Sequence, residues 1–217
     1  KFTVLSKPKG ELDFKARTWD VDFLKDNGWK IIVNSKAEID DLILQYKKIS
    51  NDHLNAFEDY NANTIIIWSG LYKFENYLEE DNRQNALKKE ITEVTSDYLS
   101  LVFHKFMDRE KCPVNIRINN KILSPFNPFP LNESDFRPIA YKQRNFSTDT
   151  IKIEGFVLPS RSIDESKKGL SIWTTKNRGL MDMEGIYIYR ADRIILFGGW
   201  NGLIKKAPRL QLARLRV

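Results

Sequence analysis

The fold of this chain is decided by MEGIYIYRADRIILFGGW, residues 183–200. Two runs rich in β-branched and aromatic side chains flank the pair Ala191-Asp192, and Gly-Gly-Trp follows the second run. Such runs, separated by two residues that tolerate a turn, predict a β-hairpin. Arg190 and Arg193 should then lie on either side of its turn.

The chain after this hairpin is basic. Residues 205–216 carry five positive charges and no acid, and apolar residues alternate with Arg214 and Arg216 up to Val217, which predicts a last strand. A basic surface can meet the phosphates of a nucleotide or of nucleic acid. It can equally be a charged sheet edge that resists pairing with another chain. On the first interpretation, the nucleic-acid contacts are Arg190, Arg193, Arg209, Arg214 and Arg216.

A glycine-rich turn joins the hairpin to this basic segment. Residues 198–202 read Gly-Gly-Trp-Asn-Gly, and glycine lets a backbone approach a ligand closely and adopt positive φ. Lys205 and Lys206 follow directly, so the pair is a candidate phosphate contact. The alternative is a plain turn.

Composition bounds the class of protein. The chain has 217 residues, a formal net charge of +6 and 41% hydrophobic residues, as is ordinary for a folded protein of one large or two small domains. No apolar run approaches the ~20 residues of a membrane span. Cys112 is the single cysteine, which excludes an intrachain disulfide and a cysteine-based metal site, and we expect a cytoplasmic setting.

The organisation along the chain predicts an α+β fold. Strand-like runs come first, then a helix at Ser35–Ile49, a strand at Thr64–Trp68 and a long helix over about Asn82–Met107, before a second strand-rich part. We expect a domain boundary within residues 70–110. Because the chain begins and ends in strand-like sequence, we also expect an excised fragment.

Catalytic motifs are scarce. The sequence holds no P-loop, no G-x-S-x-G, no H-E-x-x-H and no cluster of cysteine and histidine, so no catalytic residue and no metal ligand is nominated. Asp20 and Asp22 would share one face of a strand and could hold a metal, or else face solvent or cap a turn. His104, near the end of the long helix, is interpreted as a surface or hydrogen-bonded histidine.

Several motifs, taken in order, resemble those of the GHKL ATPases, the superfamily of gyrase B, MutL and MORC proteins, and above all MORC-like bacterial ATP-binding proteins. The quoted segments cover nearly the whole chain: FTVLSK (2–7), ARTWDVD (16–22), NTIIIWSGL (63–71), YLSLVFHKF (98–106), IRINNKILSPFNPF (116–129) and GIYIYR (185–190).

The resemblance implies the end of a Bergerat-type α/β sandwich at residues 1–75, a connecting helix at 76–110 and a ribosomal-protein-type β-α-β transducer domain at 111–217. In relatives, ATP-driven dimerisation of the first domain moves the transducer, which contributes a lysine to the γ-phosphate. The resemblance therefore implies ATP and Mg²⁺ as cofactors of the parent protein, the upstream ATP-binding half and a second copy as partners, and action on DNA or in defence.

The chain also departs from the family pattern. The Asn and Asp-x-Gly-x-Gly boxes that bind Mg²⁺ and adenine should lie upstream of Lys1, and Asn63 and Glu184 stand where the family usually has glycine and glutamine. The fragment alone should therefore bind no cofactor and hydrolyse no ATP. Thr64, Lys205 and Lys206 are the only cofactor contacts that the chain can offer.

Two interpretations from other classes stay open. One is a non-catalytic basic module that binds nucleic acid, with affinity that falls steeply as salt rises. The other is a scaffold that dimerises through the apolar face of the long helix, from Leu87 to Val102.

Overall fold

The chain forms two compact units with mixed α and β structure. The computed structural model describes residues 1–49, 62–74, 79–118, 121–129, 131, 136, 138–159 and 172–217. Helix makes up 32% and strand 30%, which confirms the α+β class at this level. Unit 1 comprises Lys1–Leu87 and Asn119–Lys121, and unit 2 comprises Lys88–Ile118 and Ile122–Val217. The division at residue 87 lies within the segment expected to be a connecting helix.

Unit 1 is built on an antiparallel four-stranded sheet. Its strands run in the order β3-β2-β1-β4, namely β3 (Ile32–Val33), β2 (Lys15–Trp19), β1 (Phe2–Ser6) and β4 (Thr64–Trp68). Helices α1 (Val21–Asn27) and α2 (Lys36–Ile49) lie between β2 and β4 in the sequence, and a 3₁₀ turn, η2 (Tyr72–Phe74), follows β4. Residues 50–61, between α2 and β4, lie outside the described residues.

The core of unit 1 lies on one face of this sheet. Alternation along β1 and β4 buries Leu5 and Ile65 with Ala16 and with Ile39 of α2. The opposite face carries Phe2, which lies between the rings of Trp19 and Trp68 at 5.8 and 6.3 Å. Because these residues alternate with the buried ones, the sheet is apolar on both faces.

The two acidic residues Asp20 and Asp22 do not share a strand. β2 ends at Trp19, and Asp20 is the N-cap of α1, where its carboxylate accepts a hydrogen bond from the backbone N–H of Asp22 at 3.1 Å. Lys1 forms an ion pair with Asp20 at 2.9 Å, and this contact holds the pKa of the Asp20 carboxyl below its usual range. The alternating sequence around residue 20 is thus a helix start, and the interpretation as a paired-carboxylate site is wrong.

The long helical segment is present but is not uniform. It comprises α4 (Glu80–Lys89), a π-helical turn η3 (Glu90–Thr95), α5 (Ser96–Val102) and α6 (His104–Met107). The Ser96 hydroxyl donates to the Ile91 carbonyl at 2.6 Å within the π turn. Leu101 is fully buried in the core of unit 2, and Tyr98 packs on Phe197 at 6.0 Å. Part of the apolar stripe that a dimerising scaffold would expose therefore packs inside unit 2.

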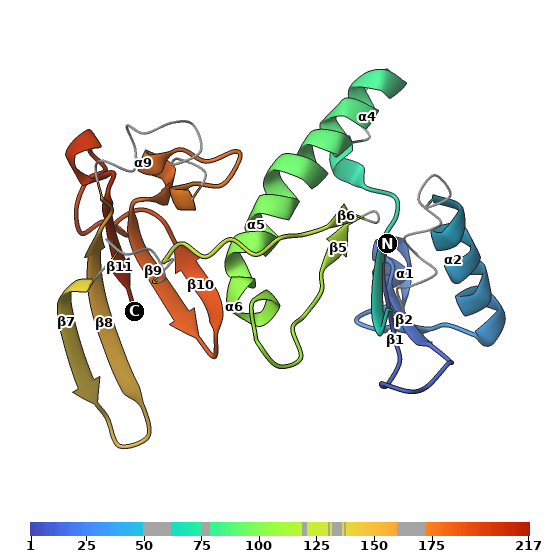
Figure 1. The fold of residues 1–217 in the computed structure, drawn as a ribbon. Helices are drawn as coiled ribbons and strands as arrows, with labels where there is room; N and C mark the ends of the chain where they lie inside the picture. The colour runs from blue at the N-terminus through green and yellow to red at the C-terminus, as the bar shows by residue number, and fades with distance from the viewer. Residues whose placement is uncertain are drawn as a thin grey trace. The chain divides into compact units, whose positions relative to one another are not determined.

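Unit 2 holds a five-stranded sheet with one parallel pair (Figure 1). The order is β10-β9-β11-β8-β7, and only β9 and β11 are parallel. The bounds are β7 (Pro138–Asn145), β8 (Thr150–Val157), β9 (Gly185–Arg190), β10 (Arg193–Phe197) and β11 (Ala213–Arg216). The sequence did not lead us to expect β7.

Shorter elements complete unit 2 and its boundary with unit 1. A two-stranded sheet pairs β5 (Arg117–Ile118) with β6 (Lys121–Ile122), and residues 119–120 between them lie outside the described residues. Helix α9 (Leu180–Met183) precedes β9, and a 3₁₀ turn, η4 (Pro208–Leu210), precedes β11. None of the helices in the described parts of the chain is long and apolar enough to cross a membrane.

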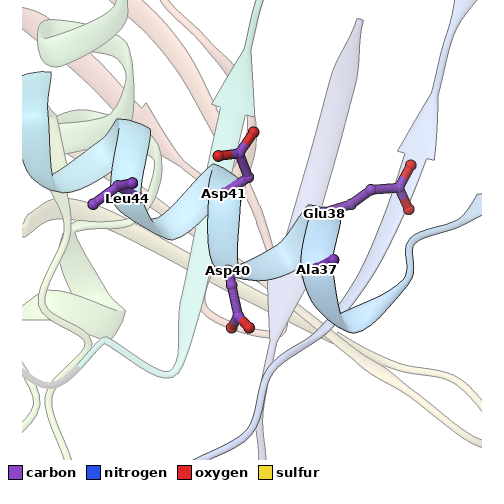
Figure 2. A pocket seen from close by; sticks show the side chains of 5 residues that line it. All are labelled: Ala37, Glu38, Asp40, Asp41 and Leu44. Carbon is purple, nitrogen blue, oxygen red and sulfur yellow. The ribbon is translucent and has the colours of Figure 1, made fainter.

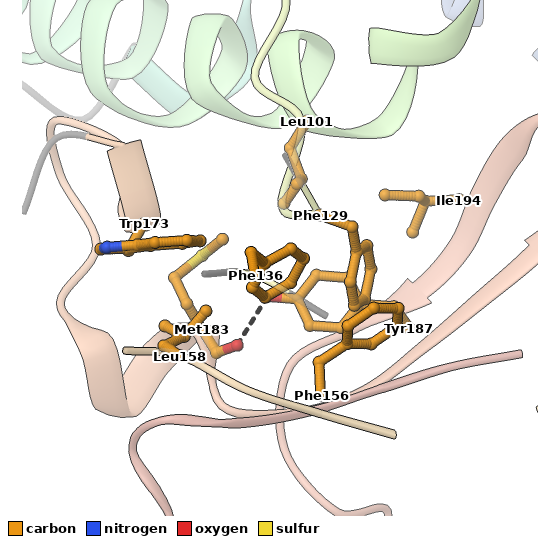
Figure 3. Close-up of a cluster of buried hydrophobic side chains, with 9 residues drawn as sticks. All are labelled: Leu101, Phe129, Phe136, Phe156, Leu158, Trp173, Met183, Tyr187 and Ile194. Atoms are coloured by element: carbon orange, nitrogen blue, oxygen red, sulfur yellow. Dashed lines mark hydrogen bonds between the residues drawn. The ribbon is translucent and has the colours of Figure 1, made fainter. Parts of the chain in front are cut away.

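Aromatic rings dominate the core of unit 2 (Figure 3). The ring of Phe129 lies 5.1 Å from those of Phe156 and Tyr187, and Phe136 stacks on Phe156 at 4.9 Å. The Tyr187 hydroxyl donates to the Met183 carbonyl at 2.6 Å, the dashed bond in Figure 3, and burial raises the pKa of Tyr187 to about 12. The segment before β7 thus supplies the core side chains Phe129 and Phe136.

Arg214 lies inside this unit, 1% exposed. Its guanidinium donates to the carbonyl of Pro128 at 2.6 Å and to the carbonyl of Trp173. The alternation at the end of the chain suggested that Arg214 faces solvent. That expectation is wrong, because β11 is an inner strand and this side chain points into the core.

We expect Arg214→Met to destabilise unit 2 by roughly 2–4 kcal/mol, because it removes a donor from two buried carbonyls, each costing about 1–3 kcal/mol when unsatisfied. Urea unfolding monitored by circular dichroism measures this difference. Arg209→Met is the matched control, because Arg209 is exposed on η4, and it should change stability by less than about 0.5 kcal/mol. Equal effects of the two substitutions would contradict a structural role for Arg214.

Candidate functional site

Two groups of residues in unit 2 contain most of the cations expected from the sequence. We call the first the hairpin end, which is Arg190–Arg193 with Lys105 and Arg109. We call the second the glycine loop, residues 198–207 between β10 and η4.

The hairpin end confirms the hairpin expected from the sequence. Arg190 and Arg193 are direct cross-strand partners in β9 and β10. Ala191 and Asp192 both have positive φ, 47° and 67°, as a tight two-residue turn requires. Like charges placed directly opposite each other destabilise a strand pair, so the two arginines form a position that an anion would stabilise.

The carboxylate of Asp192 is already engaged. It forms ion pairs with Lys105 at 3.5 Å and Arg109 at 3.2 Å, so it is shared between two cations of the helical segment. Among the described residues, Arg190 is exposed and forms no ion pair. The hairpin end therefore holds four cations and one carboxylate, and two of the cations contact that carboxylate.

Aromatic rings lie beneath these cations. The Lys105 ammonium is 4.5 Å from the ring centre of Tyr189, and the Arg109 and Arg193 guanidinium groups lie 4.3 and 5.3 Å from the rings of Phe106 and Phe103. Such contacts hold a cation in place without neutralising its charge. The hairpin end is thus an ordered basic surface.

His104 lies below this surface and is 1% exposed. Its Nδ1 is 2.8 Å from the Leu101 carbonyl, and its Nε2 is 3.4 Å from the Tyr189 hydroxyl. Burial lowers the pKa of the His104 imidazole, and the charge of Lys105 acts in the same direction. The ring is therefore a hydrogen-bonded core group, one of the two roles expected for it.

The glycine loop is held by very close backbone contacts. Gly199 N–H donates to the Glu184 carbonyl at 2.6 Å, and Ile186 N–H donates to the Gly199 carbonyl at 2.8 Å. A Cβ on Gly185, where φ is +109°, would lie 2.0 Å from the Gly199 oxygen. Only glycine fits there, so the glycines serve the backbone contact between β9 and the loop.

Glu184 fixes both ends of this loop from inside the protein. It is 0% exposed, and its Oε1 accepts hydrogen bonds from Trp200 Nε1 at 3.2 Å and from the backbone N–H of Ala207 at 3.3 Å. Its Oε2 is buried and has no hydrogen-bond partner among the described residues. The carboxylate therefore positions the loop that carries Lys205 and Lys206, both of which are exposed.

The other nominated residues lie in several places. Thr64 is an exposed residue at the start of β4 in unit 1, opposite Ser6. Arg209 is exposed on η4, and Arg216 forms an ion pair with Glu154 at 2.6 Å. Of the five arginines nominated for nucleic acid, Arg190 and Arg193 lie together, whereas Arg214 is buried in the core.

Sequence reasoning missed further cations of unit 2. Lys105 and Arg109 follow a four-residue spacing at the end of the helical segment, which was the available signal. Lys142, Arg144 and Lys152 lie on β7 and β8, for which the available signals were the alternation along β8 and the turn residues Ser147-Thr148-Asp149 before it.

In the described part of unit 1, one acidic hollow lies along α2 (Figure 2). Ala37, Glu38, Asp40, Asp41 and Leu44 line it, all from α2. Glu38 accepts hydrogen bonds from the backbone N–H and hydroxyl of Ser35 at 2.7 and 2.9 Å, so it caps the helix. Within the described ranges, no group of three acidic, histidine or cysteine side chains could hold a metal ion.

Comparisons with protein-family models, with curated proteins and with solved structures find no match for this chain.

We expect His104 to make the stability of unit 2 depend on pH. The folded-state pKa lies below the ordinary value of about 6.5, so the neutral ring stabilises the fold above that pH, and this contribution is lost as pH falls toward the folded pKa. The difference in unfolding free energy between the parent and His104→Gln should therefore shrink from pH ~7.5 to pH ~5. Urea titrations at several pH values measure it, and a constant difference would contradict the assignment.

Proposed function

We propose that this chain is the closing part of the ATP-binding domain and the transducer domain of a GHKL-type ATPase, similar to MORC-like bacterial proteins. The parent protein acts as a cytoplasmic homodimer whose transducer couples ATP binding and hydrolysis to action on DNA or in defence. The observation that carries this proposal is the open apolar face of unit 1.

This open face is formed by β1, β2 and β4 on the side away from the unit 1 core. Ile66 and Trp68 alternate with the buried Ile65 and are 57% and 58% exposed. A sheet face with such side chains needs a second layer, because apolar surface of this kind is normally covered. We assign this layer to the upstream half of the ATP-binding domain.

Thr64 supports the same assignment. Along β4, Thr64 alternates with Ile65 and so lies on the face that carries Ile66 and Trp68. In this position its hydroxyl points toward the space that the upstream half would fill, where the family binds its nucleotide. Thr64 is therefore our candidate for the contact of unit 1 with ATP.

The described residues fit part of an ATP·Mg²⁺ site. Lys205 and Lys206 are exposed at the end of the glycine loop, and two neighbouring cations suit a phosphate. Mg²⁺ prefers carboxylate, phosphate and water oxygens, and we assign its protein ligands to the upstream half of the domain. ATP bound there would supply the γ-phosphoryl group that is transferred to water, and this hydrolysis would drive the protein.

We expect the 217-residue chain alone to give no change in tryptophan fluorescence with a non-hydrolysable ATP analogue and Mg²⁺, because the adenine and metal contacts lie upstream. A longer chain that carries the residues before Lys1 should bind the analogue, and Ile66→Asp should abolish binding there by placing a charge in the covered face. Leu12→Asp is the matched control, since Leu12 is 86% exposed in a turn region. Micromolar nucleotide binding by the 217-residue chain would contradict the proposal.

Nucleic-acid binding without catalysis is the second candidate function. It is favoured by the hairpin end, where Arg190 and Arg193 face each other and the single carboxylate is already shared by Lys105 and Arg109. A phosphate between the two arginines would relieve their repulsion. This candidate does not require ATP.

We expect short duplex DNA to bind the 217-residue chain with an affinity that falls as KCl rises from about 50 to 200 mM. Removing two phosphate contacts with Arg190→Gln and Arg193→Gln should make the negative slope of log K against log salt less steep by about 1.8. Fluorescence anisotropy of labelled DNA measures both. An unchanged slope would exclude the hairpin end as a phosphate contact.

A further inference from the structure

A two-stranded ribbon extends from the sheet of unit 2. Among the described residues, β8 pairs with β11 from Glu154 to Val157, whereas it pairs with β7 from Thr150 to Phe156. The outer parts, Lys142–Asn145 and Thr150–Ile153, therefore pair only with each other, and the loop Phe146–Asp149 joins them. We call this the β7–β8 ribbon, and Figure 1 shows it running past the end of β11.

The ribbon is exposed on both faces. Every residue from Lys142 to Lys152 is exposed, and these include the apolar side chains of Phe146 (47%) and Ile151 (43%). A two-stranded ribbon is only marginally stable in water without something packed against it. Its outer strand β7 is also a sheet edge among the described strands. Both faces are thus available to a ligand.

Positive charge lies on both faces of the ribbon. Cross-strand partners share a face, so Lys142 and Arg144 lie with Ile153 and Ile151, and Lys152 lies with Gln143 on the other. The nearest acids do not balance these charges. Glu154, at the base, is paired with Arg216 at 2.6 Å, and Asp149 lies in the loop, where it accepts a hydrogen bond from Thr148.

The face that carries Lys152 also holds an ordered row of hydrogen-bonding side chains. The Tyr141 hydroxyl donates to Gln143 Oε1 at 2.6 Å, and Gln143 Nε2 donates to Asn145 Oδ1 at 3.0 Å. The Thr150 hydroxyl donates to the same Asn145 oxygen at 3.2 Å. These bonds fix the two amides in one direction before any ligand arrives. Glutamine and asparagine amides are the side chains that read the edge of adenine in the major groove.

Arg144 is ordered in a similar way. Its guanidinium lies 5.2 Å from the ring centre of Phe146 at the start of the loop, so the charge is held beside the tip of the ribbon.

We infer that the β7–β8 ribbon binds in the major groove of duplex DNA, with Lys142, Arg144 and Lys152 on phosphates and Gln143 and Asn145 toward base edges. The major groove admits a two-stranded β-ribbon, and the phosphates that flank the groove suit a ribbon that carries cations. This inference rests on the nucleic-acid candidate function and adds a second DNA contact to the hairpin end.

Two other occupants fit less well. A second copy paired antiparallel along β7 would bring Lys142 and Arg144 against the same cations of its partner, which is unfavourable. An acidic peptide could add as a strand to the β7 edge through hydrogen bonds to the β7 backbone. Lys152 and the amides of Gln143 and Asn145 would then have no particular role in binding. Duplex DNA uses both faces.

Fluorescence anisotropy with a short labelled duplex and the full 217-residue chain tests the inference. Lys142→Gln, Arg144→Gln and Lys152→Gln together should weaken binding at least about tenfold and lower the salt slope by about 2.7. The matched control, Lys9→Gln, Lys30→Gln and Lys36→Gln, removes three exposed charges from unit 1 and should change affinity less than about twofold. Lys142→Arg, Arg144→Lys and Lys152→Arg should retain binding, and circular dichroism checks that each variant is folded.

The outcomes separate this inference from the functions on which it rests. DNA binding that is lost in the Arg190→Gln, Arg193→Gln variant but retained in the ribbon variant overturns the ribbon contact alone. No binding of DNA by the parent chain overturns the ribbon contact and the nucleic-acid candidate together, while nucleotide binding is measured separately. A polyglutamate peptide that binds the parent but not the ribbon variant, with DNA binding unaffected, overturns the inference in favour of strand addition.

Discussion

The buried guanidinium of Arg214 is the interaction on which unit 2 depends. Arg214 lies on β11, the middle strand of the sheet, and donates to the carbonyls of Pro128 and Trp173. These carbonyls belong to the segments that lead into β7 and α9, so one side chain joins the strand to two distant connections. The Nε of Arg214 is buried without a hydrogen-bond partner among the described residues, so these two bonds are the ones that offset the cost of burying the charge.

Both candidate DNA surfaces are attached to the sheet that Arg214 organises. β9 pairs with one side of β11 and carries the hairpin end, and β8 pairs with its other side and carries the β7–β8 ribbon. Rigid strands hold side chains more precisely than loops do. Part of the excess positive charge of the chain therefore lies on the sheet of unit 2. The sheet of unit 1 instead has an exposed apolar face, on which Thr64 lies.

Local patterns explain which parts could be predicted from the sequence. The hairpin 185–197, β4 and the limits of the helical segment follow from alternation, turn residues and three-to-four spacing, and all of them are present. Alternation alone cannot tell which face of an inner strand is buried, so Arg214 was expected at the surface. The alternation around Asp20 predicted a strand, but Asp20 is the N-cap of α1. Capping depends on the backbone N–H groups of the residues that follow, which alternation does not reveal. β7 was missed because a proline begins it and every residue in it is exposed.

The central claim is that unit 2 folds around its own core whereas unit 1 is one layer of a larger domain. Among the described residues, nine side chains form the buried cluster of unit 2 and four form that of unit 1. Amide hydrogen exchange on the 217-residue chain tests this claim most directly. The expected result is that amides in β9 and β11 exchange only through global unfolding, and that those in β1 and β4 exchange at least about a hundredfold faster. Equal protection of the two sheets would contradict the claim, because unit 1 would then need no further layer.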